Sequence, residues 1–133
     1  KDLILIKPTI GMNKSGVVVK EVTGHFGLIV SEIFIVVDDV DLSLGKIRIR
    51  PKGGDGCHRG LKDIIYQLQS NQFPRVRLGI ATEVNMRPAE EYVLKPFQEK
   101  DLPDVKFMVK LGADALENIL NEGLSYTMNH FNC

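Results

Sequence analysis

The chain has 133 residues, of which 44% are hydrophobic and 26% are charged, an ordinary composition for a single globular domain. Lysine and arginine together number 17, as do aspartate and glutamate, so the formal net charge is zero. A neutral chain is not a general polycation, so any nucleic-acid site must be a local basic patch. No apolar run approaches the ~20 residues of a membrane span, and no signal peptide is visible, so we expect no membrane partner.

The first third of the chain predicts a strand followed by a helix. The chain begins with Lys1 rather than methionine, directly before an apolar run, so we expect its natural beginning to be missing. The apolar run at residues 3–6 predicts a strand. Apolar side chains at helical spacing predict a helix over residues 15–24, with Asn13 as its N-cap.

The middle of the chain predicts two strands. The fully apolar run at residues 33–37 is typical of a buried, central strand, and it ends in Asp38 and Asp39. A turn at residues 43–45 leads into residues 46–50, where basic and apolar side chains alternate. This period of two predicts a strand with a basic face and an apolar face.

The second half predicts a helix, a strand and a long helix. Apolar residues recur at i, i+3, i+4 and i+7 over residues 58–69, and residues 75–81 alternate again. One helix is expected from residue 102 onward, with Gly112 and Gly123 as its weak points. Helices interleaved with strands predict a three-layer α/β domain.

Asp38 occupies a position where catalytic carboxylates are common, just past a buried strand. Such a carboxylate can orient or charge-stabilise a histidine base. Aspartate is also frequent at strand ends, so Asp38, Asp39 and Asp41 could equally be turn residues. The residue pattern alone leaves both interpretations open.

The glycine-rich stretch at residues 53–56 matches no nucleotide-binding fingerprint. It would still let a backbone approach a bulky partner, and the helix after it would offer its N-terminus to an anion. A merely flexible loop is the alternative. His58, at the helix start, is a candidate ligand or acid/base, or simply a cap. Cys57 and Cys133 show no metal-ligand spacing and are expected to be free thiols.

Four arginines give the chain its nucleic-acid signal. Arg48 and Arg50 lie on one predicted strand face, and Arg75 and Arg77 lie on another. If the two strands are neighbours, the four side chains form one patch, and arginine binds phosphate through two parallel hydrogen bonds. A solvated face, or ion pairs with acidic residues, is the alternative.

Four stretches, in this order, resemble the bacterial-type peptidyl-tRNA hydrolases: LIKPTIGMNKSG, FIVVDDVDLSLGKIRIRPKGGDGCHRGLKDI, FPRVRLGIA and EYVLKPF. The resemblance covers nearly the whole chain. It implies one domain over residues 1–133, an α/β three-layer sandwich with a mixed, mostly parallel sheet. It also implies hydrolysis of the ester that joins a stalled peptide to the 3′ ribose of its tRNA, which recycles tRNA for translation without a metal or other cofactor.

The resemblance also implies roles for particular residues. Asp38 matches the aspartate that positions and stabilises the histidine base, and Asn13 matches the asparagine that helps hold the peptide and the attacking water. His58 matches the histidine of the family's HNG motif. The neighbouring residues expected to contact substrate are Met12, Arg59 and Gly56. The tRNA phosphates would meet Arg50 and Arg77, together with Arg48 and Arg75 on the same strands.

The sequence departs from the family pattern in several places. The opening GLGNPG strand and the TRHN motif with the catalytic histidine occur nowhere in it, and none of its three histidines stands at the base position. Arg59 replaces the HNG asparagine, and Cys57 replaces the glycine before the histidine. We therefore expect the fold's N-terminal strand and helix to be missing, an open sheet edge beside residues 33–37, and little hydrolysis by this stretch in isolation.

Two functions follow from this resemblance, and a folded remnant or alternative-splice product without activity is a third option. One is peptidyl-tRNA hydrolysis, and the other is a catalytically inactive RNA-binding or ribosome-associated protein of the same fold. Arg59 leans toward the second, because arginine adds phosphate affinity where the enzyme needs a neutral group. The expected partner is tRNA or peptidyl-tRNA in both cases. The family implies a monomer, with association through the open edge as the alternative. The cytoplasm is the default location, with an organelle as the alternative.

Overall fold

The computed structural model of the chain describes residues 3–82, 86 and 88–132. It divides into two compact units. The helical unit contains residues 1–33 and 52–73, and the sheet unit contains residues 34–51 and 74–133. The helical unit packs one helix against another, and the sheet unit packs helices against a sheet.

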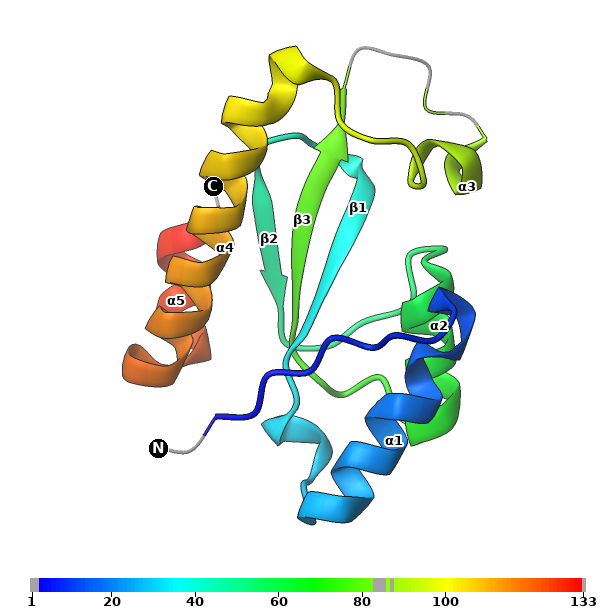
Figure 1. Cartoon of the computed structure of the whole chain (residues 1–133). Helices are drawn as coiled ribbons and strands as arrows, with labels where there is room; N and C mark the ends of the chain where they lie inside the picture. Colours follow the sequence, from blue (N-terminus) through cyan, green and yellow to red (C-terminus); the bar gives the residue numbers. More distant parts are fainter. Residues whose placement is uncertain (1–2, 83–85, 87, 133) are drawn as a thin grey trace. The chain divides into compact units, whose positions relative to one another are not determined.

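Two helices form the helical unit. The short 3-10 helix η1 (Met12–Lys14) leads into α1 (Ser15–Phe26), and α2 (Arg59–Leu68) lies beside α1 (Figure 1). A second 3-10 helix, η2 (Val30–Glu32), follows α1. Both long helices confirm the predictions made from apolar spacing, and the apolar face of α2 buries Leu61 and Ile64.

The two helices meet at Gly16. Its backbone N–H donates to Oδ2 of Asp63 at 2.7 Å. A Cβ on Gly16 would lie only 2.2 Å from the carbonyl oxygen of Asp63, a backbone atom that cannot swing away. The absence of a side chain at residue 16 therefore allows α1 to approach α2 this closely.

Two predictions for the helical unit were wrong. Residues 3–6 form neither helix nor strand, and their side chains are 42–83% exposed. An apolar run becomes a strand only against a partner, and none of the described residues pairs with this one. Asn13 is not the N-cap of α1, because it lies within η1; the N-cap is Lys14, which makes no side-chain capping bond.

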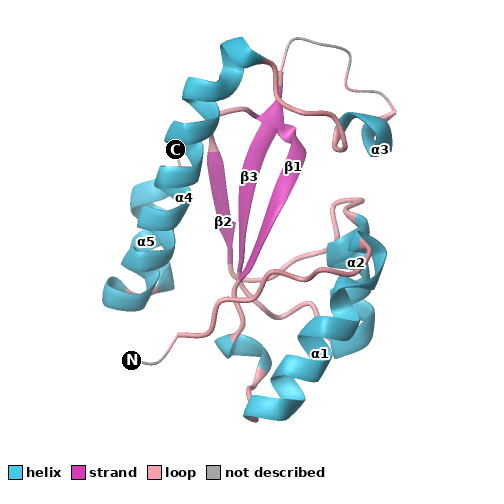
Figure 2. Ribbon diagram, viewed as in Figure 1, coloured by secondary structure: helices cyan, strands magenta, loops and turns pink. Residues whose placement is uncertain are grey.

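Three strands form the sheet of the other unit: β1 (Ile35–Ser43), β2 (Ile47–Arg50) and β3 (Arg75–Ala81). Their order is β1-β3-β2, with β1 parallel and β2 antiparallel to β3 (Figure 2). The expected mixed sheet of an α/β fold is confirmed. The strand predicted at residues 33–37 begins at Ile35. Among the described strands β3 is central and β1 lies at an edge, so the central position predicted from the apolar run is wrong, whereas the edge expected beside these residues is found.

One face of the sheet carries the apolar core. The helices α4 (Leu102–Glu122) and α5 (Leu124–Phe131) pack on it (Figure 1). The buried core residues are Ile47, Ile49, Val76, Met108, Ala115 and Ile119. The single helix predicted from residue 102 is interrupted at Gly123, whose φ of 91° no regular helix contains.

Short elements connect β3 to α4. The helix α3 (Ala89–Tyr92) and the 3-10 helix η3 (Glu99–Asp101) lie in this connection. The Tyr92 hydroxyl donates to the carbonyl oxygen of Ile80 at 2.5 Å and lies 3.1 Å from Oγ1 of Thr82, so the connection is held against the end of β3. Among the described residues, no helix combines the length and the apolar character needed to cross a membrane.

The free edge of β2 is closed by a side chain. Oδ1 of Asn132 accepts from the N–H of Ile49 at 2.7 Å, and Nδ2 of Asn132 donates to the carbonyl oxygen of Ile49 at 2.8 Å. The amide of Asn132 thus occupies both hydrogen-bonding groups that Ile49 would otherwise present to another strand.

Candidate functional site

A tight turn precedes α2 in the helical unit. The N–H of His58 donates to the carbonyl oxygen of Asp55 at 2.9 Å, and the N–H of Cys57 donates to Oδ1 of Asp55 at 2.8 Å. Gly56 and Cys57 have φ values of 55° and 64°. Two consecutive left-handed residues characterise a type I′ turn, and the second of them here is a cysteine, which adopts this conformation less readily than glycine.

His58 caps α2. Its Nδ1 accepts a hydrogen bond from the backbone N–H of Leu61 at 3.1 Å, so Nδ1 carries no proton in this arrangement. The proton of the neutral ring then lies on Nε2. In this tautomer Nε2 is a hydrogen-bond donor and does not accept a proton from water.

Met12 and His58 lie together over Gly60. A Cβ on Gly60 would be 2.6 Å from Sδ of Met12 and 3.1 Å from Cε1 of His58. The structure therefore brings these two predicted site residues onto one small surface of the helical unit. The neighbouring candidates Asn13, Gly56 and Arg59 are exposed on the same unit, at η1 and in the first residues around the start of α2.

Strand register brings the four arginines of the sheet unit together. Arg48 lies directly opposite Arg77, and Arg50 lies directly opposite Arg75. Directly paired residues of an antiparallel ladder point to the same face, so all four side chains start from the face opposite the apolar core. We call this surface the arginine face. The patch predicted from the alternation of the two strands is thus present in the pairing.

The four arginines differ in exposure. Arg50 is exposed, with Nη1 donating to the carbonyl oxygen of Ile49 at 3.3 Å, and Arg48 and Arg77 are half-buried. Arg75 is 0% exposed. Burial, and secondarily the charge of Arg77, lowers the pKa of Arg75 from its ordinary value.

Asp38 and Asp39 point to opposite faces of the sheet. Both lie within β1, because the strand continues through them instead of ending before them. Asp38 pairs in register with Leu78, whose side chain packs against the apolar core, whereas Asp39 pairs with Gly79 on the arginine face. Asp38 is therefore a half-buried carboxylate on the core side of β1.

The sequence analysis missed the role of Asp39. Its Oδ2 lies 3.7 Å from Nη1 of Arg77, and its Oδ1 accepts from the N–H of Asp41 at 2.9 Å. A bulge in β1 follows Asp39, and a Cβ on Gly79 would lie 2.1 Å from the carbonyl oxygen of Ser43 in that bulge. The period-two alternation could have indicated the opposite orientations of Asp38 and Asp39, but not this bulge.

The two remaining histidines lie outside these groups. His25 makes an edge contact with Phe26, with ring centroids 4.7 Å apart, and His130 stacks on Tyr126 at 4.0 Å. Cys57 is an exposed free thiol, while Cys133 lies outside the described residues. Within the described part of the chain, no three histidine, cysteine, aspartate or glutamate side chains are grouped in a way that could hold a metal ion.

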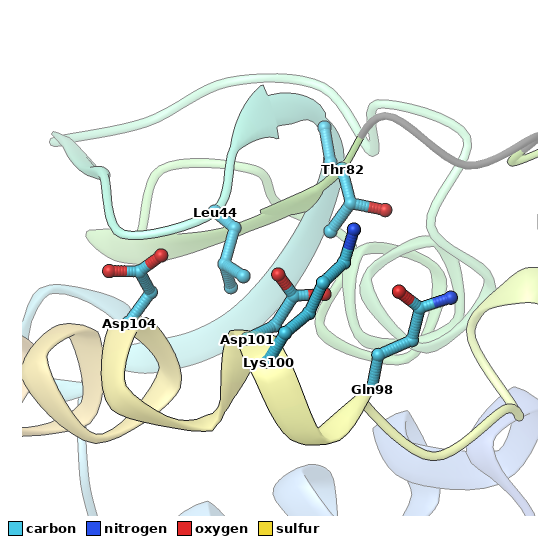
Figure 3. Close-up of a pocket in the computed structure, with 7 residues that line it drawn as sticks. Leu44, Thr82, Gln98, Lys100, Asp101 and Asp104 are labelled. Carbon is cyan, nitrogen blue, oxygen red and sulfur yellow. The ribbon is translucent and has the colours of Figure 1, made fainter.

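An open hollow lies at the end of β3, and none of the residues predicted for the site lines it. Figure 3 shows Leu44 and Thr82 across from side chains of the segment that leads into α4. Its lining is mixed in charge, with one lysine and two aspartates. The lining residues are Leu44, Ala81, Thr82, Gln98, Lys100, Asp101 and Asp104.

Comparisons of the chain with known proteins all point to one family. The family model described as "Peptidyl-tRNA hydrolase" matches residues 1–133. The chain is 39% identical over 132 residues to a peptidyl-tRNA hydrolase of Pseudothermotoga lettingae, covering 99% of this chain and 71% of that protein. It is 41% identical over 128 residues to one of Geobacillus thermodenitrificans, covering 96% of this chain and 69% of that protein.

Solved structures agree in fold. A complex of peptidyl-tRNA hydrolase with N-propanol superimposes with a TM-score of 0.80 at 29% identity. The peptidyl-tRNA hydrolase of Acinetobacter baumannii gives a TM-score of 0.80 at 26% identity. Each comparison covers 95% of this chain but 64% of the solved one, so the chain spans somewhat less than two thirds of those structures.

Proposed function

The chain belongs to the peptidyl-tRNA hydrolase family, and we propose from this that it acts in the hydrolysis of peptidyl-tRNA. The observation that carries the proposal is the match of the family model to residues 1–133. The substrate is the ester between a peptide and the terminal ribose of tRNA, and its cleavage returns tRNA to translation.

The chemistry is the addition of water to an ester. The water oxygen attacks the carbonyl carbon, the bond from that carbon to the ribose O3′ breaks, and one proton of the water passes to the departing O3′ to give the 3′-hydroxyl. The other proton is released to solvent, so the peptide leaves as a carboxylate. We assign charge stabilisation to Asp38, because a carboxylate stabilises the cation formed when a base takes the proton of water; no residue of this sequence is assigned as that base.

We assign the helical unit to binding the reacting end of the substrate. Asn13 and Met12 would hold the peptide and the water, and His58, Gly56 and Arg59 would line the same surface. His58 is assigned as a donor and not as the base, because its Nδ1 is occupied by the N–H of Leu61 and its Nε2 carries the proton.

The arginine face is assigned to the tRNA backbone. Arg48, Arg50 and Arg77 would bind phosphates, since guanidinium groups pair with phosphate oxygens and these three retain exposed surface. Arg75 is 0% exposed, so it would contribute positive potential and no direct contact. We further propose that the protein works as a cytoplasmic monomer.

A hydrolysis assay tests the proposal. The chain, in excess over peptidyl-tRNA, is expected to release peptide slowly, and Asp38→Asn is expected to lower the rate at least roughly tenfold by removing the stabilising charge. Asp41→Asn, on the same strand, is the matched control and should leave the rate within about twofold. Filter binding with deacylated tRNA, run beside the assay, should give equal affinities for both variants.

The same experiment separates hydrolysis from the second candidate function. Arg59, which brings a cation to the start of α2, favours an RNA-binding protein without catalysis. Binding of tRNA with no cleavage above the rate in buffer would contradict the hydrolysis proposal and favour that alternative. Cleavage that persists in Asp38→Asn would contradict the role given to Asp38.

A further inference from the structure

Asp39 and Arg77 form an ion pair on the arginine face. Oδ2 of Asp39 lies 3.7 Å from Nη1 of Arg77, and the two side chains are 16% and 18% exposed. The carboxylate is held in place from its other oxygen, because Oδ1 of Asp39 accepts the N–H of Asp41 at 2.9 Å. A carboxylate fixed by the backbone in this way cannot move far from the guanidinium.

The sheet register explains why Asp39 reaches Arg77. On β1, Asp39 pairs with Gly79, which lies two residues after Arg77 on β3. Side chains at i and i+2 of a strand share a face, and a glycine leaves no side chain between the carboxylate and the guanidinium. Arg77 also lies directly opposite Arg48, so the carboxylate of Asp39 lies beside two neighbouring positive charges.

This arrangement affects any anion that approaches Arg77. A phosphate at the guanidinium meets the carboxylate of Asp39 at close range, and the two negative charges repel each other. The phosphate must therefore replace Asp39 or bind against its repulsion.

We propose that Asp39 is a positioning residue that lowers the tRNA affinity of the arginine face by holding Arg77 in an internal ion pair. The inference rests on the proposed function, because it takes Arg77 to meet the tRNA backbone. A weaker grip suits an enzyme that must release its tRNA after each turnover, since product release limits many enzymes.

Filter binding of deacylated tRNA over a series of salt concentrations tests the inference. Asp39→Asn, which is nearly the same size but neutral, is expected to bind roughly two- to tenfold more tightly at low salt. Its slope of log affinity against log salt should steepen by up to about one, because phosphate no longer exchanges with an internal partner. Asp39→Glu keeps the charge and should stay within about twofold of the natural chain.

Two control variants distinguish an effect of the ion pair from an effect of net charge, and a melting experiment excludes an effect of unfolding. Asp41→Asn makes the same change of net charge two residues further along β1, in the irregular stretch after Asp39, and should alter the affinity by less than about twofold. In an Arg77→Gln background, Asp39→Asn should give no gain beyond that control. Thermal melting of each variant confirms that the compared chains are folded.

The outcomes separate this inference from the proposed function. If Arg77→Gln alone leaves tRNA binding unchanged, Arg77 does not meet tRNA, and both the assignment and the inference fail. If Arg77→Gln weakens binding but Asp39→Asn leaves it unchanged or weaker, the assignment of Arg77 stands and the inference is overturned. An equal gain from Asp39→Asn in the Arg77→Gln background also overturns it.

Discussion

The two units place their candidate functional residues by different means. In the helical unit, Met12 and His58 are positioned by close backbone approaches, at Gly60 and through the capping bond to Leu61. In the sheet unit, the arginines are positioned by strand register, with an apolar core on the opposite face. Added side chains should therefore be most damaging where α1 approaches α2 at Gly16, whereas the sheet unit should tolerate small additions outside the bulge, where Gly79 lies against the backbone of Ser43.

The largest effect on stability is expected for a substitution at Gly16 in the helical unit. Gly16→Ala puts a Cβ 2.2 Å from a backbone oxygen, so α1 and α2 must separate, and we expect a loss of at least about 3 kcal/mol in the free energy of unfolding. Urea denaturation followed by circular dichroism measures the loss.

Two other glycines serve as controls for that substitution. A Cβ on Gly24, also in α1, meets nothing within 4 Å, so Gly24→Ala should stabilise by up to about 1 kcal/mol through helix propensity. A Cβ on Gly112 would lie 3.1 Å from Cδ2 of Leu78, a side-chain end that can shift, so Gly112→Ala should change stability by less than about 1.5 kcal/mol. Equal losses for Gly16→Ala and Gly112→Ala would contradict the contrast.

A smaller effect is expected at the edge of the sheet unit. Asn132→Ala removes both hydrogen bonds to the backbone of Ile49, and we expect a loss of about 1 to 3 kcal/mol. Chemical denaturation gives the loss, and sedimentation reports any association through the uncovered edge of β2. Asn121→Ala, an exposed position of α4, is the control and should cost nothing measurable; a similar loss there would remove the edge role of Asn132.

The smallest effect on stability is expected in the turn before α2. Cys57 has a φ of 64°, which glycine adopts at no steric cost, so Cys57→Gly should stabilise by up to about 1 kcal/mol. Cys57→Ala, which keeps the Cβ, removes the thiol without relieving the backbone and should leave stability nearly unchanged. Differential scanning calorimetry distinguishes the two, and an equal gain in both variants would show that the thiol, not the backbone, was responsible.

Local patterns in the sequence were sufficient to predict features that depend on one helix or one strand at a time. The alternation of residues 46–50 and 75–81 predicted the arginine face, and apolar spacing predicted α2. The parts decided by long-range neighbours were not accessible in this way. The edge position of β1 depends on strand order and was expected only from the family resemblance, and the cap of Ile49 by Asn132 joins residues 83 positions apart. Resemblance of motifs supplied the family, which composition and periodicity could not.

We propose that the register of β2 and β3 creates a phosphate-binding face, and the salt dependence of tRNA binding tests this proposal. The triple variant in which Arg48, Arg50 and Arg77 are alanine should bind deacylated tRNA much more weakly, and its salt slope should be shallower by about two to three. A control with Lys100, Lys106 and Lys110 changed to alanine makes the same change in net charge on exposed positions outside the sheet, and should keep most of the affinity. Equal losses in both triple variants, or an unchanged slope in the arginine variant, would contradict the account.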